Sequence, residues 1–187
     1  MANFILTDLE KNRVSLLPFS YTRPISEIRV GILTIREKWE KLLNNSCSYH
    51  TAAYLSQKFP IKETSTNTYI NSAILPQKGL SAEISALEEG QAILKNENFI
   101  AAKADKERFN EGLTNGFKGF ETISTDAPFD LIENNWEIFQ KNGEQVKLDF
   151  ELLTNGRESQ TLGHTNQQFG QHPVFIEEGA QVECATI

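Results

Sequence analysis

The chain has 187 residues, of which 39% are hydrophobic and 23% are charged, so it can bury one core of ordinary domain size. A formal net charge of −7 argues against nucleic acid as a partner, because phosphate backbones need a broad basic surface. No apolar run approaches the roughly 18 residues of a membrane span, and the start MANFILTDLEKNR has no signal-peptide pattern. These features predict a cytoplasmic globular protein with no membrane partner.

Cysteine and histidine offer little redox or metal chemistry. Cys47 and Cys184 are too few for a disulfide scaffold. Cys47 and His50 are the one close pair of potential metal ligands, whereas a zinc site needs about four. The sequence therefore predicts neither a disulfide nor a zinc site.

Basic residues concentrate near the start of the chain. Residues 1–41 hold seven Lys and Arg against five Asp and Glu, a net charge of +2, whereas the remaining residues hold 11 against 20, a net charge of −9. A basic pocket for a small phosphorylated ligand fits this distribution. A solvated helix face that carries Arg36, Lys38 and Lys41 is the alternative.

Two elements are predicted at the start of the chain. Residues 3–6 read as a short buried strand, followed by the polar loop TDLEKNR. From Pro24 onward, apolar side chains recur at spacings of three and four, which predicts a core-facing helix with Pro24 in its first turn. These side chains are Ile25, Ile28, Ile32, Ile35, Trp39 and Leu42. Gly31 lies inside this predicted helix, where it costs about 1 kcal/mol relative to alanine, so a close packing contact is expected there.

Strands and helices then alternate as far as residue 153. Residues 68–76 predict a second buried strand, and residues 80–87 a helix that stops near Gly90. Residues 92–102 alternate around a KNEN turn and predict a β-hairpin. A short helix is expected at 105–113, a helical turn at 136–139 and another helix at 146–153 after Gly143. This order predicts an α/β domain with a mixed sheet.

The character of the sequence changes after residue 153. Residues 154–172 are polar and contain glycine, which indicates a linker or a functional loop. In residues 173–187, Ile176 and Val182 lie six apart with a Gly-Ala pair between them, which is the period of a left-handed β-helix. One coil cannot bury itself, so the pattern predicts the start of a stacked β-helix. A lone terminal strand is the alternative.

Five segments that cover most of the chain resemble one known family. They are NFILTDLEKNR, LLPFSYTRPISEIRVGILTIREKWEKLL, YINSAILP, NNWEIFQKNGEQVKLDFELLTNGRES and VFIEEGAQVECATI. They are similar to the alternative form of the bifunctional uridyltransferase and acetyltransferase of UDP-N-acetylglucosamine synthesis. The resemblance implies a nucleotide-diphospho-sugar transferase-like, Rossmann-like domain of mixed sheet at residues 1–153. It also implies a left-handed β-helix that begins at 173–187, which in relatives carries acyltransferase activity and commonly forms trimers.

The implied reaction is nucleotidyl transfer in cell-envelope precursor synthesis. A nucleoside triphosphate and a sugar 1-phosphate would give an NDP-sugar, UDP-N-acetylglucosamine by resemblance, and pyrophosphate. Catalysis of this kind consists mainly of aligning two anionic reactants and neutralising their charge with cations and Mg²⁺. The resemblance thus implies Mg²⁺ as the cofactor and a homotrimer as the assembly.

The motifs of ordinary sugar-phosphate nucleotidyltransferases are a loop that ends in Arg and a segment similar to PLTxTRPKxLLPVG. Arg13 matches the loop Arg, residues 22–24 match TRP, and residues 30–31 match VG. If Pro24 opens a helix, Arg23 lies at its N-terminal end, where the helix dipole favours a phosphate. The candidate catalytic cations are Arg13, Arg23 and Arg29; the candidate substrate-binding residues are Asp8, Thr22, Asn71 and Ser72; and Asp8 is the first candidate metal ligand.

Three positions depart from these motifs. The loop DLEKNR contains no glycine, so its backbone has less freedom to wrap a triphosphate. Ile25 stands where the family lysine contacts phosphate, and Ala73 stands where the metal-binding Asp is found. These departures favour an alternative function, a catalytically degenerate domain that binds a nucleotide or sugar phosphate or supports a β-helical acyltransferase. Arg29 and Arg36 could also pair with glutamates on a helix surface.

Overall fold

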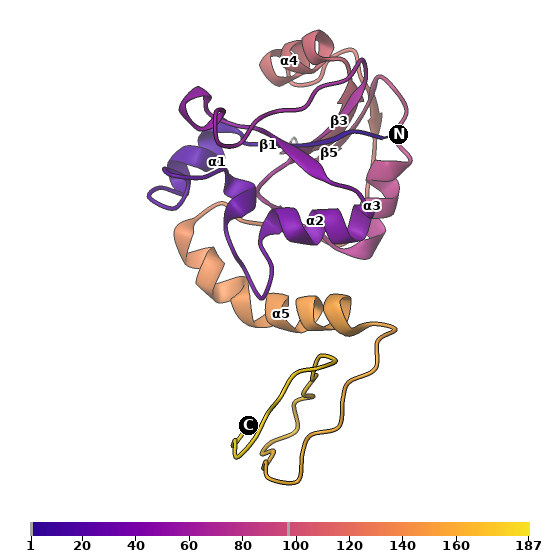
Figure 1. Cartoon of the computed structure of the whole chain (residues 1–187). Coiled ribbons are helices and arrows are strands. Elements are labelled where there is room, and N and C mark those ends of the chain that lie inside the picture. The colour runs from indigo at the N-terminus through magenta and orange to yellow at the C-terminus, as the bar shows by residue number, and fades with distance from the viewer. Residues whose placement is uncertain (1, 97) are drawn as a thin grey trace. The chain divides into compact units, whose positions relative to one another are not determined.

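A computed structural model describes residues 2–96 and 98–187 of the chain. The chain divides into two compact units, Met1–Asp149 and Phe150–Ile187, and each is described by itself (Figure 1). The last helix of the fold, α5 (Asn135–Thr154), begins in the first unit and ends in the second.

The first unit is built on a six-stranded sheet in the order β2-β1-β3-β6-β5-β7. Its strands are β1 (Phe4–Thr7), β2 (Cys47–His50), β3 (Asn67–Asn71), β5 (Gln91–Lys95), β6 (Asn98–Ala104) and β7 (Glu121–Ile123). β1 is parallel to β2 and β3, β6 is antiparallel to β3 and β5, and β7 is parallel to β5. A separate antiparallel pair joins β4 (Ile74–Leu75) to β8 (Asp130–Leu131). The predicted mixed sheet is confirmed.

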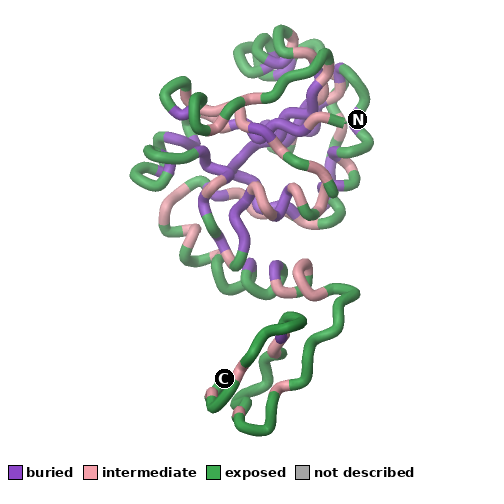
Figure 2. Tube along the Cα trace, viewed as in Figure 1, coloured by how far each residue is buried: buried purple, intermediate pink, exposed green. Residues whose placement is uncertain are grey.

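Helices cover both faces of this sheet (Figure 1). On one face, α2 (Ile35–Leu43) and α3 (Lys78–Ser85) pack their apolar side chains against alternate strand residues such as Leu6 and Ile70. On the other face, α4 (Lys106–Asn115) buries Phe109 against Ile5 and Tyr69. Figure 2 shows that buried positions follow the strands and the inner sides of these helices. Successive strand residues point to opposite faces, so one strand serves both layers.

Several predicted elements are confirmed with small changes in their bounds. These are the first strand, the helix at 80–87, the β-hairpin of β5 and β6, and the helix at 105–113. The single strand predicted at 68–76 is instead divided into β3 and β4, which belong to different sheets. In the KNEN turn of the hairpin, Glu97 lies outside the described residues. The polar stretch expected to be a loop after the first strand contains instead a short helix, α1 (Glu10–Ser15), which buries Asn12 and Arg13.

The single long helix predicted from Pro24 is wrong. Its first part is a three-residue 3₁₀ helix, η1 (Ile25–Glu27), and α2 begins only at Ile35, after the Thr34 side chain caps it by accepting from the Glu37 N–H. Between them, residues 28–35 form a tight turn with Gly31 at φ +91°. The residues at this spacing are buried, as Ile25, Ile28 and Ile35 show, but they belong to a 3₁₀ helix, a turn and α2 and not to one helix.

A continuous helix replaces the two short ones predicted around Gly143. α5 runs through Gly143 without interruption for 20 residues. A Cβ added at this glycine would meet nothing within 4 Å, so no neighbour requires a glycine here, and Gly143 does not interrupt the helix. In the part of the chain that the structure describes, no helix is both long and apolar enough to cross a membrane.

In the second unit, hydrogen bonds link extended stretches that lie far apart in sequence. The Gln160 N–H donates to the Ile176 carbonyl at 2.9 Å, and the Phe169 N–H donates to the Ile187 carbonyl at 2.7 Å. An isolated parallel bridge joins Gln167 to Thr186. Residues 155–187 contain no strand beyond this isolated bridge, and the left-handed β-helix and its alternative, a lone terminal strand, both stay predictions.

Candidate functional site

The carboxyl ends of three parallel strands meet at one edge of the sheet. Thr7 at the end of β1 is in register with His50 of β2 on one side and with Asn71 of β3 on the other. Asp8 and Ser72 follow directly, and their N–H groups continue the ladder to the carbonyls of His50 and Thr7. Ligands of open α/β sheets bind outside the carboxyl ends of the strands, so this edge is the first place to look for a site.

Asp8 and Arg13 form a buried ion pair at this edge. The Arg13 guanidinium lies 2.9 Å from the Asp8 carboxylate, and the side chains are 8% and 0% exposed. The second carboxylate oxygen of Asp8 accepts from the Ile25 N–H at 3.1 Å. Thr51, just beyond β2, also donates to Asp8. The two residues predicted to meet the ligand here therefore meet each other.

The other arm of Arg13 holds the chain that follows α1. Its guanidinium donates to the Ser20 carbonyl at 2.8 Å and to the Tyr54 hydroxyl at 2.7 Å. The Tyr54 hydroxyl in turn donates to the Tyr21 carbonyl at 2.7 Å. Arg13 thus joins the end of β1, the segment after α1 and the 3₁₀ helix η2 (Ala53–Leu55).

Burial dominates the protonation equilibria at this edge. Desolvation raises the pKa of the Asp8 carboxyl, while hydrogen bonds from Thr51 and Arg13 oppose that rise. Desolvation also lowers the pKa of His50, which favours the neutral ring at neutral pH. At the opposite end of β2, burial raises the pKa of the Cys47 thiol to about 12, so this cysteine is a poor nucleophile.

Asn71 and Ser72, both predicted to bind substrate, lie at this edge, although Asn71 is already engaged. Its amide donates to the Phe99 carbonyl at 3.0 Å, and its oxygen accepts from the Ala73 N–H at 3.0 Å. Among the described residues, the Ser72 hydroxyl has no partner although it is buried, as is true of the Thr7 hydroxyl and His50 Nδ1. Buried polar atoms without partners are few in folded proteins, so these three are positions where a ligand or water would add hydrogen bonds.

A second group of predicted residues lines a neighbouring pocket of about 340 Å³. It is formed by Pro18, Phe19, Thr22, Arg23, Ile28, Arg29 and Ile138. The pocket joins two cationic side chains to an apolar wall. The Ile25 N–H that binds Asp8 is two residues from Arg23, so this pocket and the Asp8–Arg13 pair share one short segment of chain. The structure brings Thr22, Arg23 and Arg29 together, and separately Asp8, Arg13, Asn71 and Ser72.

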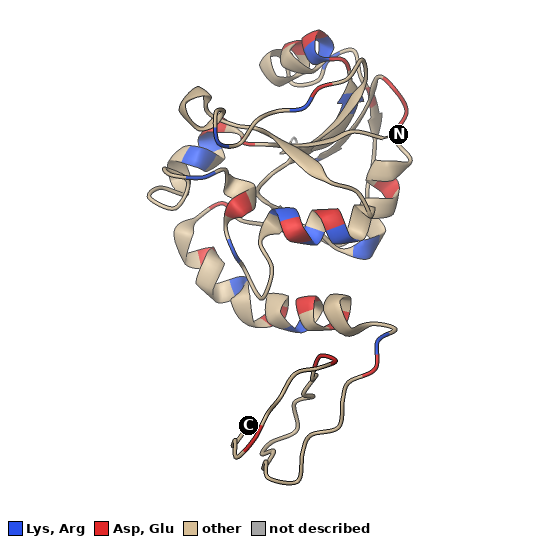
Figure 3. Ribbon diagram, viewed as in Figure 1, with Lys and Arg blue, Asp and Glu red and all other residues tan. Residues whose placement is uncertain are grey.

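Arg23 and Arg29 differ in their pairing. No carboxylate among residues 2–96 and 98–187 lies within ion-pair distance of Arg23, which is exposed. Arg29 lies 3.7 Å from Glu37, with its side chain 56% exposed, and it donates to the Ile32 carbonyl. Figure 3 shows basic positions on α1 and in the segment after it. Arg23 therefore has the more available charge.

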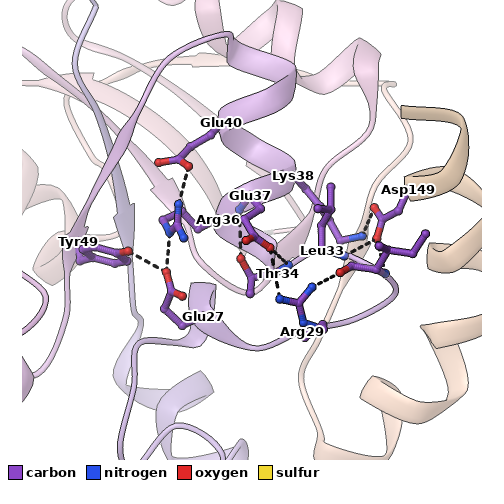
Figure 4. A network of polar contacts seen from close by, with 11 residues as sticks. Glu27, Arg29, Leu33, Thr34, Arg36, Glu37, Lys38, Glu40, Tyr49 and Asp149 are labelled. Carbon is purple, nitrogen blue, oxygen red and sulfur yellow. Dashed lines mark hydrogen bonds and ion pairs between the residues drawn. The ribbon is translucent and has the colours of Figure 1, made fainter. Parts of the chain in front are cut away.

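Two further early cations, Arg36 and Lys38, serve the fold. Arg36 bridges Glu27 and Glu40, and Tyr49 donates to the same Glu27 at 2.7 Å (Figure 4). Lys38 pairs with Asp149 in a site where both side chains are 2% exposed. The expected helix-surface pairing is thus what Arg36 does, whereas Lys38 is not solvated at all.

Residues of α5 support the pocket in a way that sequence reasoning missed. The Asp149 carboxylate accepts from the N–H groups of Ile32 and Leu33 at 2.8 and 3.0 Å (Figure 4). Asn142 accepts from the Gly31 N–H at 2.8 Å. These contacts hold the turn that carries Arg29. The local sequence does not predict these hydrogen bonds, because their partners lie more than 110 residues apart.

The residues at the strand edge do not fit a protein-held Mg²⁺. Both oxygens of Asp8 are taken up by donors, one of them a guanidinium. Within the described residues, no group of three or more His, Cys, Asp or Glu side chains lies close enough together to hold a metal ion. Mg²⁺ needs oxygen ligands in near-octahedral geometry, and a carboxylate that faces an arginine is a poor one.

Most of the chain matches the model of one known protein family. Residues 4–158 match the model described as sugar nucleotidyl transferase, which is more than half of the chain. The chain belongs to the sugar nucleotidyl transferase family. No curated protein matches it. The family match supports a nucleotidyltransferase-like domain of mixed α/β fold, with nucleoside triphosphate and sugar phosphate as the substrates that such a family suggests.

Proposed function

We propose that this sugar nucleotidyl transferase forms UDP-N-acetylglucosamine and pyrophosphate from UTP and N-acetylglucosamine 1-phosphate. The observation that carries the proposal is the pocket of Arg23 and Arg29 beside the carboxyl edge of β2, β1 and β3. An oxygen of the sugar phosphate attacks the α-phosphorus of UTP, and the bond to pyrophosphate breaks. Negative charge builds up on the phosphoryl oxygens during this step, and nearby guanidinium groups stabilise it.

Roles for the remaining residues follow from their places. Thr22 lines the pocket beside Arg23 and would hydrogen-bond a phosphate oxygen. The buried Ser72 hydroxyl would gain a partner from a ligand at the strand edge. Mg²⁺ enters this proposal as the counter-ion that accompanies the triphosphate, because the described residues offer no fitting ligand set.

Pyrophosphate release from UTP and N-acetylglucosamine 1-phosphate, in the presence of Mg²⁺, tests the activity. We expect release by the parent chain and a loss of kcat/KM of about 100-fold or more in Arg23→Ala, since one charge-stabilising donor contributes roughly 3 kcal/mol. Lys147→Ala is the matched control, because Lys147 is exposed on α5 and pairs only with Glu144 among the described residues. Full activity in Arg23→Ala contradicts the site.

The second candidate function is a catalytically degenerate domain that binds a nucleotide or sugar phosphate. It is favoured by the inward-turned Arg13, which is 7% exposed and occupies the place of the phosphate-loop arginine. In this case UDP-N-acetylglucosamine binds without any turnover, and Arg23→Ala abolishes that binding. The same assay, run beside calorimetry with the product, separates the two functions.

We also propose that the chain forms a homotrimer through a β-helical acyltransferase unit. In the second unit, hydrogen bonds link extended stretches that lie far apart in sequence, and the Gln167 N–H, for example, donates to the Ala185 carbonyl at 3.0 Å. Such bonds are compatible with stacked coils. The native mass of the chain in solution tests the assembly, and a mass of one chain at all concentrations counts against it.

A further inference from the structure

The carboxylate of Asp8 accepts from three protein donors. One oxygen accepts from the Ile25 N–H, and the other accepts from Arg13 and Thr51. The side chain is fully buried. A metal ion at this carboxylate would lie beside the Arg13 guanidinium, which already neutralises it, and would compete with the three donors. The donor set is therefore that of a structural anion.

The guanidinium of Arg13 is equally occupied. One nitrogen donates to Asp8 and Thr51, and the other donates to the Ser20 carbonyl and the Tyr54 hydroxyl. The Ser20 hydroxyl returns a bond to the Arg13 carbonyl. These partners use both terminal nitrogens, so none faces an approaching phosphate.

The pair fixes the chain on both sides of Arg23. Arg13 binds the carbonyl of Ser20, three residues before Arg23, and Asp8 binds the N–H of Ile25, two residues after it. Between these anchors the backbone has little freedom. The place of the Arg23 side chain thus depends on two residues that do not line its pocket.

We propose that Asp8 and Arg13 are a positioning pair, and that the Arg23–Arg29 pocket binds a phosphate ester with no metal ion held by Asp8. The inference rests on the phosphate-binding role proposed above for Arg23. The ligand class follows from the lining: two guanidinium groups for the phosphate, and Phe19, Ile28 and Ile138 for an apolar or ring portion of the ester. Inorganic phosphate alone leaves this apolar wall uncovered and binds more weakly.

Calorimetry with UDP, in EDTA and in Mg²⁺, tests the pair in the full chain. A positioning role predicts that Asp8→Asn and Arg13→Lys weaken UDP binding by the same factor in both buffers, about tenfold. A metal-ligand role predicts a loss confined to the Mg²⁺ buffer. Because the two residues act as one unit, the double variant should be no weaker than the worse single variant.

Manganese binding, followed by electron paramagnetic resonance without nucleotide, gives an independent readout. We expect the parent and Asp8→Asn to bind Mn²⁺ equally weakly. Binding in the parent that Asp8→Asn removes would overturn the inference, as would loss of all UDP binding in EDTA. Thr51→Val, which removes one donor without burying a lone charge, replaces Asp8→Asn if the latter does not fold, as judged by circular dichroism.

Arg23→Ala separates this inference from the proposed function. If Arg23→Ala binds UDP as the parent does, the pocket is not the phosphate site and the proposed site fails, whatever the metal experiments give. If Arg23→Ala loses binding and the Asp8→Asn loss appears only in Mg²⁺, the proposed function stands and the positioning pair is wrong. Lys147→Ala again serves as the unchanged reference.

Discussion

Single side chains in this protein show how poorly charge alone indicates role. Lys38 belongs to the basic N-terminal segment and looks like a surface residue in the sequence, yet its side chain is 2% exposed and pairs with an equally buried Asp149. Desolvation lowers the pKa of Lys38, and the Asp149 carboxylate opposes that shift. Forming such a pair requires the desolvation of both charges. Removing only one partner destabilises the protein more, because the other charge stays buried without a counter-charge.

Replacing only one partner of this pair should therefore destabilise the protein. We expect Lys38→Met to lower the free energy of unfolding by about 3–5 kcal/mol, because it leaves the Asp149 charge buried without its cation. Urea unfolding followed by circular dichroism measures the change. Adding Asp149→Asn should recover a large part of the loss. Lys41→Met, at an exposed position on the same helix, should stay within about 0.5 kcal/mol.

Sequence reasoning named candidate site residues but not their mutual arrangement. Asn71 and Ser72 were candidates by resemblance, inside a strand predicted at 68–76, and in the structure they lie where β3 ends. That Arg13 turns inward to Asp8 depends on Ser20, Thr51 and Tyr54, which reach it from two other segments. A single position in the sequence carries no trace of those partners.

Among the elements, the turn between η1 and α2 departs most from the sequence pattern. The spacing of three and four residues is typical of a helix, but Gly31 adopts φ +91°. A Cβ at Gly31 would lie 2.5 Å from an Asp149 oxygen and 2.8 Å from the Gln145 backbone. The close packing contact expected at Gly31 is thus present, although it is made by a turn against α5.

Substituting this glycine should be costly for two separate reasons. We expect Gly31→Ala to destabilise the protein by more than about 2 kcal/mol, since the left-handed backbone costs about 1–2 kcal/mol and the clash with α5 adds to it. Gly116→Ala is the matched control. Gly116 has φ +72° but nothing within 4 Å, so it should show the backbone cost alone. Thermal unfolding of both variants measures the difference, and equal losses would mean that the contact with α5 contributes nothing.

Across the entire chain, the two units differ sharply in how much they bury. The first has two apolar clusters, one on each face of the sheet. Of residues 150–187, by contrast, Ile176 alone is buried. Stability of a segment follows from buried apolar contacts, so the second unit should open at a much lower free energy than the first.

Hydrogen exchange should reveal this difference directly. We expect the amides of residues 155–187 to exchange at least about 100-fold faster than those of β1, β3 and β6, because few of them are shielded by a core. Mass spectrometry of peptides after timed labelling measures the rates. Protection of residues 160–187 equal to that of β3 would contradict the expectation and would indicate that another chain or further coils cover them.

The sequence by itself determined the α/β class, the alternation of strands with helices and the residues worth testing, because hydrophobic period and motif residues are local properties. Only the tertiary structure decided that a short 3₁₀ helix and a turn follow Pro24, that α5 is continuous, and that Arg13 faces Asp8 while Arg23 lines a pocket. Two of these depend on partners distant in sequence: Asp149 for the turn at Gly31, and Thr51 and Tyr54 for Arg13. Long-range packing and buried hydrogen bonds overrode the local pattern, since buried polar groups must find partners wherever the fold provides them.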